Sequence, residues 1–204
     1  TTFLDLTTGT RFRTPLAGDF QAANGALAAA IVRALPDVQI HDEIIQRGFS
    51  ATRFPGRMEL MQATPLTLID GAHNPQKIGG LVDNLARLFP DKRIIAVFGV
   101  LETKNHGDML DLLAPHIDTL VATAPQVFAK PPISASEVAA YALGKVRQVE
   151  QRDEPLAALE HALAMAQPDD VVLVTGSLYL IGNVREHWYP SREILRQGVM
   201  WPGR

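Results

Sequence analysis

Polar side chains follow three apolar segments of this sequence, at the points where each apolar run ends. The sequence Asp-Gly-Ala-His-Asn-Pro occupies 70–75, Glu-Thr-Lys-Asn-His occupies 102–106, and Thr-Gly-Ser-Leu-Tyr occupies 175–179. A carboxylate such as that of Asp70 can accept two hydrogen bonds from a ribose diol. Nucleotide chemistry is therefore the first functional candidate.

A fourth polar segment, Phe-Pro-Gly-Arg-Met-Glu, lies at 54–59. Its Pro-Gly turn presents Arg57, and a guanidinium suits forked contacts with phosphate. An ion pair with Glu59, or an ordinary loop arginine, is the alternative. The sequence contains neither a G-x-x-x-x-G-K-[ST] loop nor a G-x-G-x-x-G fingerprint, so no familiar phosphate loop is present to hold a triphosphate.

Each motif also has a structural alternative. Asp70 and Ser177 are suitable helix caps, and Lys104 suits a solvated surface. Other chemistries are disfavoured: the six histidines have no H-E-x-x-H spacing, so a zinc site would need distant loops. The sequence Gly-Ser-Leu at 176–178 lacks the second glycine of a G-x-S-x-G elbow, which disfavours a hydrolase serine.

The elements that must position these residues alternate strictly between strand and helix. Short aliphatic runs bounded by Pro, Gly or Asp predict strands at 66–69, 94–98, 119–123 and 171–174, with a weaker one at 146–150. Apolar stripes of helical period separate them, the third capped by Ser134 or Ser136, and a last helix is expected at 178–188. This order predicts an α/β fold with a doubly wound, mostly parallel sheet and right-handed crossovers. In such a sheet the polar segments would share the edge where ligands bind.

The first 50 residues follow a different pattern. They predict a hairpin turning at Thr8 and Gly9, an Ala-rich helix at 20–35 with one apolar face, and a short helix at 40–47 that stops at Gly48. We interpret this part as the end of a preceding domain, with 49–60 as a linker. The sequence predicts no structure or role for residues 189–204.

Composition restricts the class of protein. A chain of 204 residues corresponds to about 1.4 average domains. No cysteine is present, which excludes disulfides and thiolate chemistry and fits a reducing compartment. The net charge of −3 indicates no nucleic-acid or anionic-lipid partner, and no apolar run approaches the roughly 20 residues of a membrane span. With no signal peptide recognisable, we expect a cytoplasmic, monomeric protein that binds small molecules.

Four segments together resemble one family. The sequence Leu-Ala-Gly-Asp-Phe-Gln-Ala-Ala-Asn-Gly-Ala at 16–26 is similar to the "L-x-G-x-H-Q-x-x-N-A" segment of folylpolyglutamate synthase/dihydrofolate synthase, a branch of the Mur ligase superfamily. The segments at 55–59, 70–75 and 175–179 resemble the C-terminal part of the same family in order and spacing. The resemblance covers about residues 10–188. It implies that 1–48 end a central ATPase domain, that 49–60 are a linker, and that 61–204 form a Rossmann-like, C-terminal glutamate-ligase domain.

The resemblance implies an ATP-dependent ligase of folate biosynthesis and one-carbon metabolism, which joins L-glutamate to a folate or dihydropteroate carboxyl group through an acyl phosphate. Asn24 would then contact adenine, Arg57 the nucleotide phosphates and Asp70 the ribose. On the side of the glutamate and the reacting phosphate it places His73, Asn74, Lys104, Ser177 and Tyr179. ATP and Mg²⁺ would be the cofactors, with the magnesium ligands and the phosphate loop in a missing N-terminal part. This chain alone would then be inactive.

The sequence departs from the family pattern at three positions. Phe20 replaces a common histidine, and Thr103 and Asn105 replace the two aspartates that flank the lysine matching Lys104. Two alternatives remain open: a cell-wall Mur ligase, and a non-catalytic Rossmann-like binding module that needs no phosphate loop. A nicotinamide dehydrogenase fits less well because no glycine fingerprint follows any strand.

Overall fold

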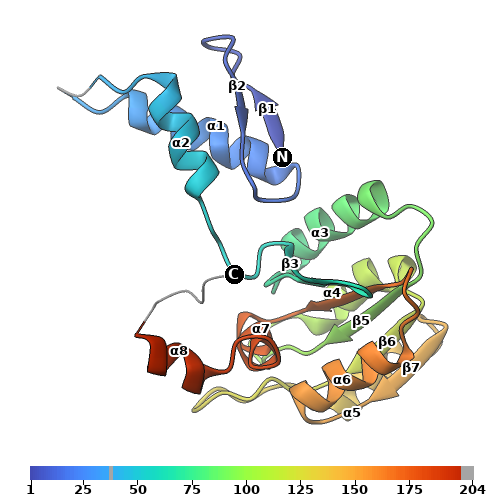
Figure 1. The fold of residues 1–204 in the computed structure, drawn as a ribbon. Coiled ribbons are helices and arrows are strands. Elements are labelled where there is room, and N and C mark those ends of the chain that lie inside the picture. The colour runs from blue at the N-terminus through green and yellow to red at the C-terminus, as the bar shows by residue number, and fades with distance from the viewer. Residues whose placement is uncertain (37–38, 199–204) are drawn as a thin grey trace. The chain divides into compact units, whose positions relative to one another are not determined.

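The computed structural model describes residues 1–36 and 39–198, which fall into two compact units, Thr1–Glu59 and Leu60–Arg204. The elements in chain order (Figure 1) are β1 (Thr2–Leu4), β2 (Arg11–Arg13), α1 (Phe20–Arg33), α2 (Asp42–Ala51), β3 (Glu59–Ala63), β4 (Leu66–Ile69), α3 (Pro75–Leu88), β5 (Ile94–Phe98), α4 (His106–Leu113), a 3₁₀ turn (Ala114–His116), β6 (Thr119–Ala122), α5 (Ala135–Ala142), β7 (Gln148–Gln151), α6 (Pro155–Met165), β8 (Val171–Thr175), α7 (Leu178–Arg185) and α8 (Ser191–Gln197). Within the described residues, every helix is too short or too polar to cross a lipid bilayer.

The first unit contains the predicted hairpin. Strands β1 and β2 are antiparallel, with Phe3 opposite Phe12, and Gly9 takes a positive φ of 73° in the turn. The rings of Phe3, Phe12 and Phe49 lie 5.4–5.8 Å apart. These rings, together with Ala29 of α1, form the small core of the unit.

Helix α1 packs through small residues. A Cβ atom added to Gly25 would lie 2.5 Å from the ring of Phe3, so only glycine permits this close approach. The apolar face predicted for this helix is mainly exposed instead: Leu27, Ile31 and Leu35 have 62%, 56% and 47% of their surface accessible.

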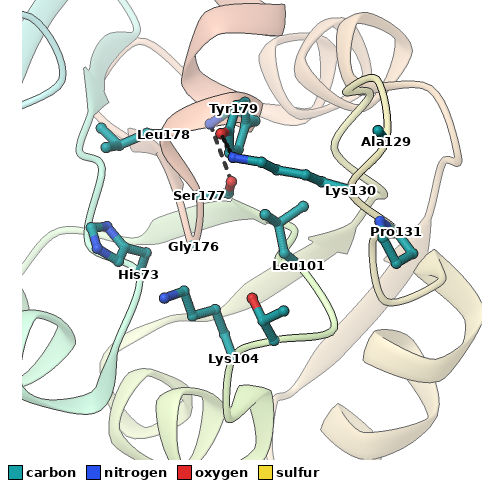
Figure 2. Close-up of a pocket in the computed structure, with 11 residues that line it drawn as sticks. His73, Leu101, Lys104, Ala129, Lys130, Pro131, Gly176, Ser177, Leu178 and Tyr179 are labelled. Atoms are coloured by element: carbon teal, nitrogen blue, oxygen red, sulfur yellow. Dashed lines mark hydrogen bonds between the residues drawn. The ribbon is translucent and has the colours of Figure 1, made fainter.

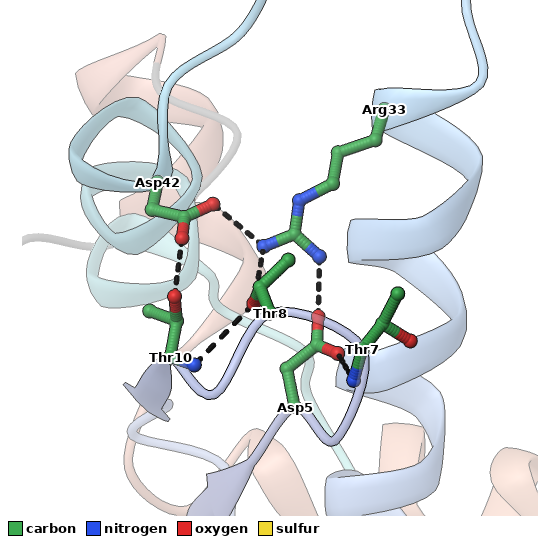
Figure 3. Close-up of polar contacts among 6 residues, drawn as sticks. All are labelled: Asp5, Thr7, Thr8, Thr10, Arg33 and Asp42. Carbon is green, nitrogen blue, oxygen red and sulfur yellow. Dashed lines mark hydrogen bonds and ion pairs between the residues drawn. The ribbon is translucent and has the colours of Figure 1, made fainter.

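One arginine joins the elements of the first unit (Figure 3). The guanidinium of Arg33, at the end of α1, donates to Asp5 beside the hairpin turn and, at 2.6 Å, to Asp42 in the first turn of α2. Asp5 also accepts the backbone N–H of Thr7 at 2.9 Å, and Asp42 accepts the hydroxyl of Thr10. Arg33 lowers the pKa of both carboxyl groups, because hydrogen bonds to the guanidinium favour the ionised form.

The prediction that the second helix stops at Gly48 is wrong, since α2 continues to Ala51. Gly48 faces open space and keeps an ordinary helical conformation. The hydroxyl of Ser50 donates to Gln46 O, and that of Thr52 donates to Gly48 O, at 2.9 Å each. The segment expected as a linker, 49–60, therefore includes the last turn of α2 and the first residues of β3.

The second unit is built on a six-stranded sheet in the order β3-β4-β8-β5-β6-β7. Strands β4, β8, β5, β6 and β7 run parallel, which confirms the doubly wound α/β fold. The strands predicted at 66–69 and 94–98 have those bounds, while β6 and β8 each differ by one residue at the carboxyl end. Strand β7 begins two residues later than predicted.

Helices cover both faces of this sheet. The connections from β4 to β5, β5 to β6 and β6 to β7 run in the same direction across the sheet. Their helices α3, α4 and α5 lie on one face, where α4 contacts both α3 and α5. The connection from β7 back to β8 runs the opposite way, and α6 packs beside α7 on the other face. Right-handed crossovers require this division. The core under α6 and α7 includes Ile95, Val97 and Val174, which are fully buried or nearly so.

Two elements of the second unit were not predicted. Strand β3 has the sequence Glu-Leu-Met-Gln-Ala, whose residues favour helices, and its pairing with β4 overrides that preference. Helix α8 lies within the unassigned tail, of which residues 199–204 are outside the described part. The side chain of Ser134 caps α5 as predicted, accepting the N–H of Glu137 at 3.1 Å.

Candidate functional site

The site lies where the strand order of the sheet is interrupted. The chain passes from β4 to β5 and only later inserts β8 between them. At the carboxyl ends of these three strands the main chain stays connected: Asp70 N–H donates to Val174 O at 2.9 Å, and Gly99 N–H donates to Thr175 O at 3.4 Å. Such a switch point opens a crevice in which parallel α/β proteins bind ligands.

The loop after β8 requires glycine at position 176. Gly176 has a φ of +108°, and a Cβ atom there would lie 2.6 Å from Gly99 O and 2.9 Å from the ring of Phe98. Its N–H donates to Ala72 O at 3.0 Å. The absence of a side chain thus lets the three loops approach one another and brings Ser177 to the crevice.

A pocket of about 380 Å³ occupies this crevice (Figure 2). Its lining residues come from the loops after β4, β5, β6 and β8: His73, Leu101, Thr103, Lys104, Ala129, Lys130, Pro131, Gly176, Ser177, Leu178 and Tyr179. The structure therefore brings together four of the predicted site residues, which come from three separate segments: His73, Lys104, Ser177 and Tyr179.

The hydrogen bonds of His73 fix its tautomer. Its Nδ1 lies 2.7 Å from Gly71 O, and a carbonyl oxygen only accepts, so we assign the ring hydrogen to Nδ1. Its Nε2 lies 3.3 Å from Nζ of Lys77, which donates to it. The half-buried imidazole therefore lines the pocket with both of its ring nitrogens already hydrogen-bonded, to Gly71 O and to Lys77.

Ser177 has a structural contact as well as a place in the pocket. It is 3% exposed and caps α7, where its Oγ accepts the N–H of Tyr179 at 3.1 Å. The Ser177 hydroxyl can still donate its own hydrogen to a ligand, because capping uses it only as an acceptor.

Asp70 and Asn74 shape the loop between β4 and α3. The buried carboxylate of Asp70 accepts the N–H of Ala72 at 2.8 Å. Asn74 caps α3 by accepting the N–H of Lys77 at 2.9 Å, and Pro75 follows in the first turn. The ligand contacts predicted for Asp70 and Asn74 would come in addition to these structural contacts, and they stay predictions.

The two remaining predicted residues belong to the first unit. Asn24 is exposed on α1 and donates to Gln21 Oε1 at 3.2 Å. The guanidinium of Arg57 lies 5.3 Å from the ring centroid of Phe54 and donates weakly to Gly56 O at 3.4 Å. Both side chains carry hydrogen-bond donors that suit a nucleotide.

The fourth wall of the pocket was not predicted from the sequence. Lys130, with Ala129 and Pro131, comes from the long loop between β6 and α5. The same reasoning that singled out the other loops would have found it, because this loop also follows the carboxyl end of a parallel strand.

The pocket suits an anionic ligand. Two lysines and a histidine line it, and the described lining residues include no carboxylate. In the described part of the chain, no group of three or more His, Asp or Glu side chains is placed to hold a metal ion. The site as built can bind carboxylate or phosphate groups through ammonium and hydroxyl groups.

Fold and site thus define a doubly wound α/β domain with a lysine-lined pocket at its switch point. Residues 56–178 match the family model described as "Mur ligase, glutamate ligase domain". The chain is 35% identical over 180 residues to a probable bifunctional folylpolyglutamate synthase/dihydropteroate synthase of Halobacterium salinarum, a match that covers 85% of this chain and 21% of the relative. It is 34% identical over 176 residues to the folylpolyglutamate synthase of Lacticaseibacillus casei, covering 84% and 39%.

Solved structures support the same relationship. The folylpolyglutamate synthase of Mycobacterium tuberculosis, complexed with ADP and AMPPCP, superposes with a TM-score of 0.78 at 27% identity, covering 87% of this chain and 42% of that one. A bifunctional folylpolyglutamate synthase/dihydrofolate synthase with Mn, AMPPNP and L-glutamate bound gives 0.74 at 27% identity, with the same coverage. This chain belongs to the Mur ligase family, in its folylpolyglutamate synthase/dihydrofolate synthase branch. It spans between about a fifth and two fifths of the length of these relatives.

Proposed function

We propose that this chain is the C-terminal part of an ATP-dependent ligase that joins L-glutamate to the carboxyl group of a folate or dihydropteroate. The observation that carries the proposal is the pocket in which His73, Lys104 and Ser177 meet, because its positive charge suits a dicarboxylic amino acid. A related structure that holds L-glutamate together with an ATP analogue supports it.

The reaction has two steps in this proposal. An oxygen of the pteroate or folate carboxylate attacks the γ-phosphorus of ATP, and ADP leaves. The amine of glutamate then attacks the acyl carbon and loses a proton, and phosphate leaves with one oxygen of the original carboxylate. Mg²⁺, when bound, would supply charge neutralisation on the phosphates, and we place its ligands in parts of the enzyme outside this chain.

The side chains of this chain divide between the two substrates. Lys104 binds a carboxylate of glutamate, and His73 and Asn74 face the amino acid and the reacting phosphate, together with Ser177 and Tyr179. On the nucleotide side Asn24 reads the adenine edge, Arg57 contacts phosphate and Asp70 accepts the ribose hydroxyls. Each role matches the chemistry of its group.

The test is a substrate comparison on the full-length gene product. With ATP and L-glutamate present, we expect ADP release that depends on dihydropteroate or a reduced folate and yields the corresponding glutamyl product, identified by mass spectrometry. Product formation with a UDP-linked peptide in place of the pterin would assign the chain to a cell-wall ligase instead. No ATP consumption with either acceptor would favour the non-catalytic binding module.

A further inference from the structure

The loop between β6 and α5 holds a second lysine against the pocket (Figure 2). The ammonium of Lys130 donates to Tyr179 Oη and lies 4.7 Å from the centroid of that ring. Lys104 enters the pocket from the loop after β5 and approaches from another side, with Ser177 between the two in this view. The two positive charges therefore come from different loops.

The backbone of the loop fixes the position of Lys130. Ala129, which also lines the pocket, takes a φ of +58°, an uncommon conformation for a residue other than glycine. The loop is also tied to the neighbouring one, because Glu102 N–H donates to Pro131 O at 3.1 Å and Ile133 N–H donates to Val100 O at 2.9 Å. A strained residue held by such contacts is characteristic of a ligand-binding loop.

The charge of Lys130 is not neutralised within the described residues. A second lysine–tyrosine pair on the same unit provides the comparison: Lys145 lies 3.7 Å from the ring centroid of Tyr141 but also pairs with Asp111 at 2.5 Å. Lys130 has only the phenol and ring of Tyr179 among its described partners. An ammonium that faces a pocket and pairs with no described carboxylate is available for an anionic ligand.

We propose that Lys130 binds one of the two carboxylates of the incoming amino acid while Lys104 binds the other, so that the pair of lysines selects a dicarboxylic amino acid. Tyr179 is a positioning residue: its hydroxyl and ring hold the ammonium of Lys130 at the pocket in the absence of ligand. The inference rests on the proposed function, since glutamate is the dicarboxylate in question.

The experiment measures amino-acid kinetics of the full-length enzyme at saturating ATP and pterin. We expect Lys130→Met to raise the KM for L-glutamate about tenfold or more with kcat changed less than about threefold, because binding loses one charge-assisted hydrogen bond while the reacting groups stay in place. Lys130→Arg should restore most of the affinity. Lys145→Met removes the same charge from the other lysine–tyrosine pair and should leave both constants unchanged.

Selectivity and coupling provide two further readouts. Glutamine and isoglutamine each lack one of the two carboxylate charges of L-glutamate. One of these amides lacks the charge that Lys130 would bind, and the preference of the enzyme for L-glutamate over that amide should fall about tenfold in Lys130→Met. Tyr179→Phe should raise the KM for glutamate less than Lys130→Met does. The double variant should be no worse than Lys130→Met, because Tyr179 acts through the lysine.

The outcomes separate the two proposals. If the unsubstituted enzyme ligates glutamate but Lys130→Met retains its KM and both selectivities, the role of Lys130 is wrong and the proposed function stands. If the unsubstituted enzyme makes no glutamyl product with any pterin, the proposed function fails and this inference fails with it. Thermal denaturation of each variant verifies that it is folded.

Discussion

The conformation of Gly176 controls how closely three loops meet at the pocket. Its positive φ, and the 2.6 Å that would separate an added Cβ atom from Gly99 O, leave no room for a side chain. Gly79 provides a contrast, because it lies within α3, and a Cβ atom there would meet no heavy atom within 4 Å. The sequence places Gly176 after a strand and Gly79 within a helix, but the close approach of Gly99 O to Gly176 is visible only in the structure.

We expect Gly176→Ala to destabilise the protein by about 2 kcal/mol or more, through backbone strain and the clash with main-chain atoms. Gly79→Ala should stabilise it by about 0.5–1 kcal/mol, since alanine has less conformational entropy to lose in a helix. Urea denaturation of both variants measures the difference. Equal midpoints would show that the loop after β8 adjusts to a side chain.

The structural contact of Asp70 and its proposed contact with ribose can be tested separately. In the full-length enzyme we expect Asp70→Ala to raise the KM for ATP about tenfold, as for the loss of a hydrogen-bonded charged group. Asp70→Asn keeps an acceptor for the N–H of Ala72, so it should retain the stability of the loop while still raising the KM. An unchanged KM for ATP in both variants would leave Asp70 with the structural role alone.

At the scale of elements, the buried strands were the easiest to predict. Strands β4, β5 and β8 are apolar runs covered on both faces, and their residues allow little else. Strand β3 and the end of α2 could not be predicted, because β3 consists of helix-forming residues and Gly48 resembles a stop signal. In both cases tertiary contacts or the following residues decide the structure, rather than local preference.

The ionic cluster around Arg33 gives the first unit a defined dependence on pH. The pKa values of Asp5 and Asp42 are lowered in the folded state, below the usual value of about 3.9. Their contribution to stability is therefore complete above that value and is lost as the pH falls through the folded pKa values.

We expect Arg33→Met to lower the melting temperature at neutral pH and to lose this deficit progressively below about pH 3.9, as the pH falls through the lowered folded-state pKa values and the unsubstituted protein also loses the interaction. Arg47→Met, at an exposed position of α2, is the matched control and should melt close to the unsubstituted protein at every pH. Circular dichroism follows the transitions. A deficit that stays constant with pH would show that Arg33 acts through packing alone.

At the scale of the whole molecule, the sequence predicted which loops share an edge of the sheet but not the order of its strands. Insertion of β8 between β4 and β5 depends on long-range pairing that no local pattern encodes. That insertion places the loop with Ser177 between those with His73 and Lys104. Lys130 was not predicted because its loop carries no recognisable motif, although this loop also follows a parallel strand.

The chain by itself should not turn over ATP. It contains no G-x-x-x-x-G-K-[ST] loop, and phosphoryl transfer depends mainly on positioning the phosphates and the metal. We expect the 204-residue polypeptide to show no phosphate release that depends on L-glutamate and dihydropteroate, while the full-length enzyme does. Glutamate-dependent release by the polypeptide alone would contradict this division of the site.

The location of glutamate is the most direct test of the pocket. A crystal structure of the full-length enzyme with an ATP analogue and L-glutamate should show the amino acid between Lys104 and Ser177, with Lys130 on its second carboxylate and the ribose at Asp70. Glutamate bound elsewhere, with the pocket at the switch point empty, would contradict the assignment of this site.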